Sequence, residues 1–219
     1  MPATLKKART FETVADLVKH LGGIPAERIL MWPPPGTAKD KDAIALADGD
    51  HRRLCELIDG ILVEKTVGVR ESFLATYLIE ILSAFVRARN LGLLLAPDGL
   101  VRLFRGQIRI PDISFISWES LPDGAVPKSA VANVAPDLVV EILSRKNTKA
   151  EMVRKRRDYF RAGGKLFWEI DPRKRTVRVY TSPDALTELN EADTLGGGKV
   201  LPGFRLALGD LFAQLDRRK

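Results

Sequence analysis

The sequence predicts a mixed α/β protein in which helices flank a central β-sheet. Three observations support this fold class. Residues 138–143 form an apolar run interrupted only by Glu141, which is typical of a strand buried on both faces of a sheet. Residues 71–89 carry apolar side chains at the spacing of an amphipathic helix. Two strand-like runs, 54–58 and 61–66, flank an Asp-Gly pair, which predicts a β-hairpin.

Residues 1–45 are predicted to form an N-terminal extension that consists of one helix and a proline-rich arm. Apolar residues at helical spacing predict the helix over residues 10–21, with Thr10 as its cap. Three consecutive prolines, 33–35, cannot continue a helix or a strand, and the charged run after them favours a linker or a surface arm. The rest of the chain, 46–219, is predicted to form the main domain.

Beyond the long helix, strand-like and helical segments alternate to the end of the chain. The predicted strands lie at 91–95, 100–104, 108–117, 138–143, 166–170 and 176–181, with a further short strand near Val200. One helix is predicted between 148 and 162, and a half-helix near Leu211. This order of elements is that of a mixed α/β domain.

The composition is that of an ordinary soluble globular protein. The 219 residues are 45% hydrophobic and 29% charged, which excludes wholesale disorder. No apolar run approaches the ~20 residues that a membrane-spanning helix needs, and the first residues contain no apolar stretch of signal-peptide length. We therefore expect a cytoplasmic protein without a membrane partner. The single cysteine cannot close an internal disulfide.

Positive charge is concentrated in one part of the chain. Residues 145–178 hold thirteen Lys or Arg against four Asp or Glu, a charge of +9, so the remainder contributes 22 minus 24, or −2, to the total of +7. A basic surface of this kind is typical of proteins that bind nucleic acid. The alternative is a solvated helix face followed by a charged hairpin turn.

Two acidic residues occupy positions where a charge is unusual. Glu141 lies inside the predicted buried strand, where an ionised carboxylate is costly unless it is paired or bound to a metal. Asp112 lies on another predicted strand, on the face opposite Ile113 and Phe115. If the two strands are neighbours, the carboxylates meet and offer Mg²⁺ the hard oxygen ligands that it prefers. The alternative is that Asp112 caps a turn and Glu141 pairs with an arginine.

The helix predicted after the buried strand carries basic residues on two sides. Lys155 lies at the edge of its apolar arc, so it can reach inward and orient the water that attacks a phosphodiester, or stabilise charge on the phosphate. Arg154, Arg157 and Arg161 share the opposite side, where they can bind the phosphates of a nucleic-acid backbone. The alternative for Lys155 is an exposed pair with Glu151, one helical turn away.

Several short motifs follow one another along the chain in the order found in a known family. They are CELIDG (55–60), RIPDISF (109–115), PDLVVEILS (136–144), Glu151-x₃-Lys155-x₃-Tyr159 followed by Gly163, FWEIDP (167–172) and LPGF (201–204). From about residue 50 to its end, the chain resembles the Uma2 proteins of the DUF820 type. These proteins are a branch of the PD-(D/E)xK restriction-endonuclease-like superfamily.

The resemblance implies a restriction-endonuclease-like core and hydrolysis of DNA phosphodiester bonds that depends on Mg²⁺ or Mn²⁺. Carried over by position, Asp112 and Glu141 are the metal ligands, and Lys155 takes the role of the superfamily's catalytic lysine. Glu56 is a further acidic position near the metal and joins the catalytic set. Two residues after Glu141 the sequence has Leu143 where the superfamily has lysine, so Lys155 must reach the same point from the helix. The resemblance permits a homodimer.

Two other functions remain open from the sequence. A protein with the same fold and basic surface can bind nucleic acid without cleaving it, in which case binding survives Glu141→Gln and requires no metal. Alternatively, the N-terminal helix and proline-rich arm can dock a protein partner, in which case nucleic acid does not bind even at low salt. The sequence does not distinguish DNA from RNA as the ligand.

Overall fold

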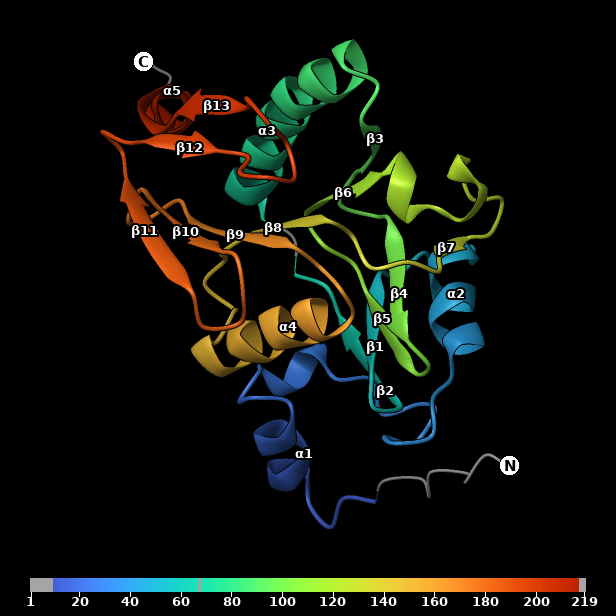
Figure 1. The fold of residues 1–219 in the computed structure, drawn as a ribbon. Coiled ribbons are helices and arrows are strands. Elements are labelled where there is room, and N and C mark those ends of the chain that lie inside the picture. Colours follow the sequence, from blue (N-terminus) through green and yellow to red (C-terminus); the bar gives the residue numbers. More distant parts are fainter. Residues whose placement is uncertain (1–9, 67, 217–219) are drawn as a thin grey trace.

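The strands form two β-sheets and a two-stranded ribbon in a computed structural model, which describes residues 10–66 and 68–216 (Figure 1). The strands are β1 (Cys55–Ile58), β2 (Ile61–Glu64), β3 (Gly92–Leu95), β4 (Leu100–Phe104), β5 (Gln107–Arg109), β6 (Ile113–Ser117), β7 (Val131–Ala132), β8 (Leu138–Ile142), β9 (Leu166–Asp171), β10 (Thr176–Tyr180), β11 (Leu186–Asn190), β12 (Thr194–Gly196) and β13 (Arg205–Ala207). The α-helices are α1 (Val14–His20), α2 (Asp40–Asp48), α3 (Val69–Ala88), α4 (Lys149–Arg161) and α5 (Leu208–Ala213), and short 3₁₀ turns lie at Ala26–Arg28, Trp118–Ser120, Pro122–Gly124 and Gln214–Asp216.

The strands divide between two sheets instead of forming the one central sheet expected from the sequence. The larger sheet has the order β11-β10-β9-β8-β6-β3, and the smaller has the order β2-β1-β5-β4-β7. The β8–β9 and β4–β7 pairs are parallel, whereas β6 pairs antiparallel with both of its neighbours. Helices cover these mixed sheets, so the predicted mixed α/β fold class is confirmed.

Helices cover both faces of the larger sheet, and this arrangement decides which way its side chains point. Figure 1 shows α3 on one side of β8 and β9 and α4 on the other. Leu78 of α3 shares a core cluster with Val140 of β8, and Tyr159 of α4 shares another with Val139 of β8. Because successive side chains of a strand alternate between faces, Glu141 lies on the same face as Val139, toward α4.

The prediction of one strand over 108–117 is wrong, because this segment forms two strands that belong to different sheets. β5 ends at Arg109 in the smaller sheet, and β6 begins at Ile113 in the larger sheet. Pro111 lies between them and has no N–H to donate to a strand partner, which explains the break. Asp112 therefore lies where the chain passes from one sheet to the other.

The N-terminal part of the chain packs against the smaller sheet. Thr13 caps α1 in a capping box, so the prediction that Thr10 is the cap is wrong. The charged run predicted to be a linker begins α2 instead, and Ala43 and Ala47 of α2 are buried in a cluster with β1. The division of the chain after residue 45 stays a prediction, although α2 runs across that position.

The remaining elements follow the predicted order, apart from the tail. The hairpin, the long helix, the buried strand and the helix after it agree with their predictions to within a few residues. The strand predicted near Val200 is wrong, since this residue lies in the turn that joins β12 and β13. β11 was not predicted, and its residues are mostly exposed, so the strand lacks the apolar alternation that marks a buried face. The half-helix near Leu211 is confirmed as α5.

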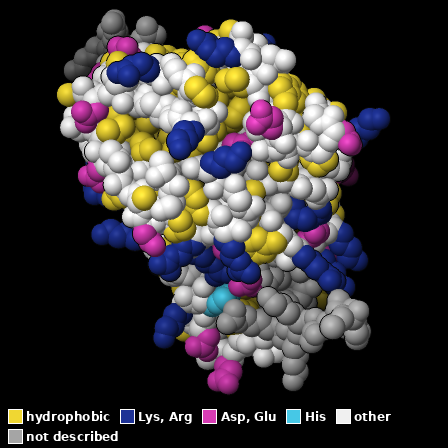
Figure 2. All heavy atoms as spheres, viewed as in Figure 1, with side chains coloured by type: hydrophobic (Ala, Val, Ile, Leu, Met, Phe, Trp, Pro, Cys, Tyr) yellow, Lys and Arg dark blue, Asp and Glu magenta, His cyan; other side chains and the backbone are white. Residues whose placement is uncertain are grey.

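On the face drawn in Figure 2, positive charge gathers near α4. Figure 2 shows Lys and Arg side chains gathered on the part of the molecule that α4 occupies in the same view of Figure 1. This helix lies within residues 145–178, whose charge of +9 exceeds the net charge of +7 of the whole chain. None of the helices in the described part of the chain is long and apolar enough to span a membrane.

Candidate active site

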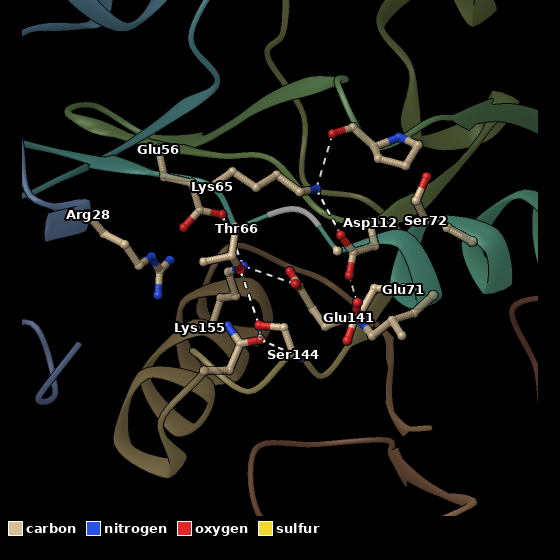
Figure 3. A pocket seen from close by; sticks show the side chains of 15 residues that line it. Arg28, Glu56, Lys65, Thr66, Glu71, Ser72, Asp112, Glu141, Ser144 and Lys155 are labelled. Carbon is tan, nitrogen blue, oxygen red and sulfur yellow. Dashed lines mark hydrogen bonds and ion pairs between the residues drawn. The ribbon is translucent and has the colours of Figure 1, made fainter. Parts of the chain in front are cut away.

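A pocket brings together residues from both sheets and from α3 and α4 (Figure 3). Its lining includes the charged residues Arg28, Glu56, Lys65, Glu71, Asp112, Glu141 and Lys155 and the polar residues Thr66, Ser72, Ser144 and Asn147. The four predicted catalytic residues, which are distant from one another in the sequence, therefore share one site. Glu56 comes from the smaller sheet, Glu141 from the larger sheet and Lys155 from α4.

Asp112 and Glu141 are brought side by side by the pairing of β6 with β8. These strands are antiparallel with Ile113 opposite Val140, so the residue before Ile113 lies beside the residue after Val140. The Oδ2 atom of Asp112 accepts a hydrogen bond of 2.7 Å from the Ile142 N–H. The structure therefore places Asp112 beside Glu141, as expected for neighbouring strands, and Asp112 bonds to the neighbouring strand, whereas the alternative had it cap a turn.

Lys155 reaches into the pocket from α4, and its ammonium lies between two acids. Its Nζ atom lies 2.9 Å from Oε2 of Glu141 and 3.1 Å from Oε1 of Glu56, and the Lys155 side chain is 5% exposed. Glu141 therefore pairs with a lysine and not with an arginine. The alternative exposed pair between Lys155 and Glu151 is wrong, because Glu151 pairs at 2.8 Å with Arg28. The helix thus supplies the lysine that the strand lacks.

The two acids that share Lys155 differ in how firmly they hold a proton. Burial raises the pKa of Glu141 to about 7, the charge of Lys155 opposes this rise, and the charges of Asp112 and Glu56 add to it. Burial also acts to raise the pKa of Glu56, but the positive charges of Lys155 and Arg109 outweigh it and bring that pKa to about 2. Burial acts to lower the pKa of Lys155, yet the two carboxylates raise it overall, so the amine stays protonated.

The residues present fit a divalent cation of the magnesium type. Asp112, directly before β6, and Glu141 of the adjacent strand β8 supply hard carboxylate oxygens, and Oε1 of Glu141 is buried without a hydrogen-bond partner among the described residues. A buried oxygen without a partner is unfavourable, and a bound cation would satisfy it. The described residues contain no group of three or more His, Cys, Asp or Glu that could hold a metal. Mg²⁺ needs none, because it is usually held by one or two carboxylates together with water and substrate phosphate.

Arg109 supports Glu56 from within the protein core, and sequence reasoning missed it. Its Nη1 atom lies 2.9 Å from Oε2 of Glu56, and its Nη2 atom pairs with Asp158 of α4. Arg109 is 1% exposed, so it fixes Glu56 and, through Glu56, the ammonium of Lys155. The available signal was an arginine between two isoleucines, Ile108 and Ile110, and a buried arginine needs a partner for the same reason as Glu141.

Lys65 is a second lysine in the pocket, and it holds Asp112. Its Nζ atom lies 2.9 Å from Oδ1 of Asp112 and donates to the carbonyls of Pro97, Ile110 and Pro111 at 3.0–3.1 Å. These oxygens fix the end of the lysine side chain and one side of Asp112. Nothing in the sequence marked Lys65, because a lysine at the end of a hairpin strand is usually a surface residue.

The three arginines predicted to bind nucleic acid lie outside the pocket, whose described lining includes none of them. Arg157 and Arg161 are exposed on α4, as predicted. Arg154 differs from the prediction of an outward side chain, because it pairs with Asp59 at 2.7 Å and donates to the His20 carbonyl at 2.9 Å. The structure thus brings the acids and Lys155 together and leaves the arginines on another face.

The fold and the pocket define a restriction-endonuclease-like protein, in which a mixed α/β core holds two adjacent acids and a lysine. The family model of Uma2, described as "Putative restriction endonuclease", matches residues 44–209. The chain belongs to the Uma2 family, and the resemblance found in its motifs is confirmed.

A solved structure shows the same fold. It is described as the crystal structure of a putative nuclease belonging to DUF820 from Anabaena variabilis ATCC 29413, and it shares 20% sequence identity with this chain. The similarity covers 78% of this chain and 96% of that one, with a TM-score of 0.68. At this identity, the similarity establishes the fold alone. No curated protein matches the chain significantly.

Proposed function

We propose that the protein is a metal-dependent endonuclease that hydrolyses phosphodiester bonds of DNA. The observation that carries this proposal is the convergence of Asp112, Glu141 and Lys155 in one pocket, with one oxygen of Glu141 buried and unpaired among the described residues. The family description and the nuclease named in the solved structure support the same class of reaction.

In this proposal, Asp112 and Glu141 hold Mg²⁺ or Mn²⁺. When bound, such an ion polarises a phosphoryl oxygen and supplies an activated water for attack in line with the leaving group. Lys155 donates one N–H to Glu141 and forms an ion pair with Glu56, and a further N–H is proposed to donate to the substrate phosphate. Glu56 is then a positioning residue, because it fixes the ammonium that contacts the substrate. Lys65 acts in the same way on Asp112.

The basic side of α4 is proposed to bind the phosphates of DNA outside the cleavage site. Arg157 and Arg161 are exposed and available for such contacts, whereas Arg154 would first have to give up its pair with Asp59. Each phosphate contact releases counterions, so binding through this face weakens as salt increases.

A plasmid-cleavage assay tests the proposed activity. We expect the purified protein to cut supercoiled DNA with Mg²⁺ or Mn²⁺, and we expect EDTA and Glu141→Gln to abolish cutting. Glu188→Gln is the matched control, since Glu188 lies on the edge strand β11 and pairs with the surface residue Arg178. The proposal fails if supercoiled, linear and single-stranded DNA all stay intact at every metal concentration.

A nucleic-acid-binding module without catalysis is the second candidate. It is favoured by the way in which both oxygens of Asp112 and the ammonium of Lys155 already have partners within the protein, and by Leu143 at the usual lysine position. Isothermal titration with Mg²⁺ separates the candidates, because a module of this kind needs no metal. If neither metal nor nucleic acid binds at low salt, the third candidate, a protein-interaction domain, is favoured.

We further propose that the protein acts in the cytoplasm, where it would meet DNA, and that it works as a homodimer. Sedimentation velocity at micromolar concentration measures the second point directly, since a particle of 24.3 kDa corresponds to one chain. Fractionation of cells that express the full chain tests the first. A single-chain species that cleaves DNA at full rate would contradict the homodimer.

A further inference from the structure

Two side chains in the pocket have a buried polar atom whose hydrogen-bonding needs are unmet among the described residues. Six residues of the described chain have such an atom, and of these only Arg28 and Glu141 line the pocket. The unmet atom of Glu141 is an acceptor, Oε1, and that of Arg28 is a donor, Nη1. Within the pocket, the Glu141 oxygen therefore lacks a cation or hydrogen-bond donor, and the Arg28 nitrogen lacks a hydrogen-bond acceptor.

Arg28 is held firmly, but only by part of its guanidinium. Its Nη2 atom lies 2.8 Å from Oε1 of Glu151, and its Nε donates to the Glu64 carbonyl at 3.0 Å. The residue is 5% exposed, and Figure 3 shows its side chain extending toward the inside of the pocket. Arginine cannot lose its charge, so the remaining Nη1 needs an acceptor that the protein does not supply in its described part.

We propose that Arg28 is a substrate-binding residue, whose Nη1 donates to a phosphoryl oxygen of the nucleic acid at the cleavage site. This inference rests on the proposed function, which places a cation at Glu141 and a phosphate next to that cation. A phosphate that contacts both the cation and Arg28 would satisfy the two unmet atoms together. Arginine is well suited to this role, because charge-assisted hydrogen bonds to phosphate are among the stronger ones in proteins.

The fold supplies Arg28 from the N-terminal part of the chain, before the start of the region that matches the family model. This part is fastened to the first turn of α4. Thr148, the cap of α4, donates to the Gly22 carbonyl at 2.6 Å, and the Arg28–Glu151 pair lies beside this contact. Gly22 has a φ of +85°, and a Cβ atom there would lie 2.9 Å from the Glu151 N atom, so the close approach requires glycine. The N-terminal segment thus completes the pocket wall.

Glu151 makes it possible to separate substrate binding from a purely structural role. If Arg28 only neutralises Glu151, then removing both charges leaves function unchanged. Glu151→Gln removes the acceptor of Arg28 Nη2, leaves the hydrogen bond from Arg28 Nε to the Glu64 carbonyl, and keeps one side-chain oxygen that can accept from Thr148 N and Asn147. Arg28→Met combined with Glu151→Gln removes the guanidinium and leaves no buried charge without a partner.

Equilibrium binding is measured by fluorescence anisotropy with a short labelled DNA duplex, in EDTA and again with Ca²⁺ in place of Mg²⁺. We expect Glu151→Gln to bind as well as the wild type, and the double variant to bind about 10- to 100-fold more weakly. The slope of log affinity against log salt concentration should also be less steep in the double variant, by about the amount that one lost phosphate contact produces. Arg175→Gln, which removes a surface arginine paired with Glu191, is the control for loss of one positive charge.

The outcomes separate this inference from the proposed activity. Equal affinities and equal salt slopes for the single and double variants overturn the inference, even if the wild type cleaves plasmid DNA. Binding that depends on Arg28 in a protein that never cleaves DNA supports the inference and overturns the nuclease proposal. If the wild type binds no duplex at low salt, the inference is also overturned.

Discussion

The two sides of α4 carry similar side chains in opposite surroundings. On the inner side, Glu151 and Lys155 are buried, and each lies in an ion pair of 2.8–3.1 Å with a buried partner. On the outer side, Arg157 and Arg161 are exposed, and the guanidinium of Arg161 lies over the Phe104 ring at 4.8 Å from its centre. A buried charge is held in one geometry and is costly to leave unpaired, whereas an exposed charge is screened by water and salt. One helix therefore serves both a fixed site and a general electrostatic surface.

The strongest test of this contrast is to remove Lys155. Lys155→Met leaves Glu56 and Glu141 buried without their shared cation, and we expect the free energy of unfolding to fall by about 3–5 kcal/mol. Urea denaturation measures this loss. Lys149→Met makes the same chemical change at an exposed position of α4 and should alter stability by about 0.5 kcal/mol or less. Equal losses in the two variants would contradict the contrast.

The buried ion pairs of Glu56 should also make the stability of the protein depend on pH. Its pKa lies at about 2 in the folded protein, below that of an ordinary glutamate. The stabilisation from the charged form is therefore complete above about pH 5 and is lost as the pH falls toward 2, by up to about 3 kcal/mol. Urea midpoints of the wild type and Glu56→Gln should differ at neutral pH and converge toward pH 2. A constant difference across this range would be evidence against the ionised, paired state of Glu56.

Arg154 lies between the two extremes, so its effect should be intermediate. Its pair with Asp59 is partly exposed, with side chains that are 23% and 41% accessible. We expect Arg154→Gln to cost about 0.5–1 kcal/mol of stability. A double-mutant cycle with Asp59→Asn isolates the pair from the other contacts of each residue. If the coupling energy between Arg154 and Asp59 were as large as the loss of stability expected for Lys155→Met, Arg154 would behave like the buried charges of α4 and the expected intermediate effect would be wrong.

The smallest effect on stability is expected at Arg157, on the exposed side. Arg157→Gln should change the free energy of unfolding by about 0.5 kcal/mol or less, and should lower the salt slope of DNA binding by about one contact if this face binds phosphates. Anisotropy titrations at several salt concentrations measure the slope, and Arg205→Gln on β13 provides a second exposed arginine for comparison. An unchanged slope would remove Arg157 from the proposed DNA-binding surface.

The sequence predicts the central part of the site because its charged residues lie in or beside apolar segments. Glu141 stands out in an apolar strand, and Lys155 lies at the edge of an apolar helical arc, so both needed partners and both have them. Asp112 could be placed beside Glu141 as soon as the two strands were assumed to be neighbours. These inferences depend only on local patterns and on the high cost of an unpaired buried charge.

The rest of the site depends on contacts that no local pattern reveals. Lys65 and Arg28 have sequence surroundings typical of exposed residues, and only the packing of distant segments buries them. The division into two sheets was also hidden, because a strand of apolar residues does not show which sheet it joins. Pro111 was the available clue, since a residue without an N–H interrupts strand pairing.

The passage of the chain between the sheets at Asp112 has a consequence for dissecting the protein. Glu56 and Arg109 belong to one sheet and Glu141 to the other, so the group of side chains exists only across the seam where the sheets meet. A fragment limited to either sheet would contain only some of these ion-paired side chains, and it would bury charged groups without their partners. The protein is therefore indivisible at this place, and a split version can regain its site only when both halves reassemble.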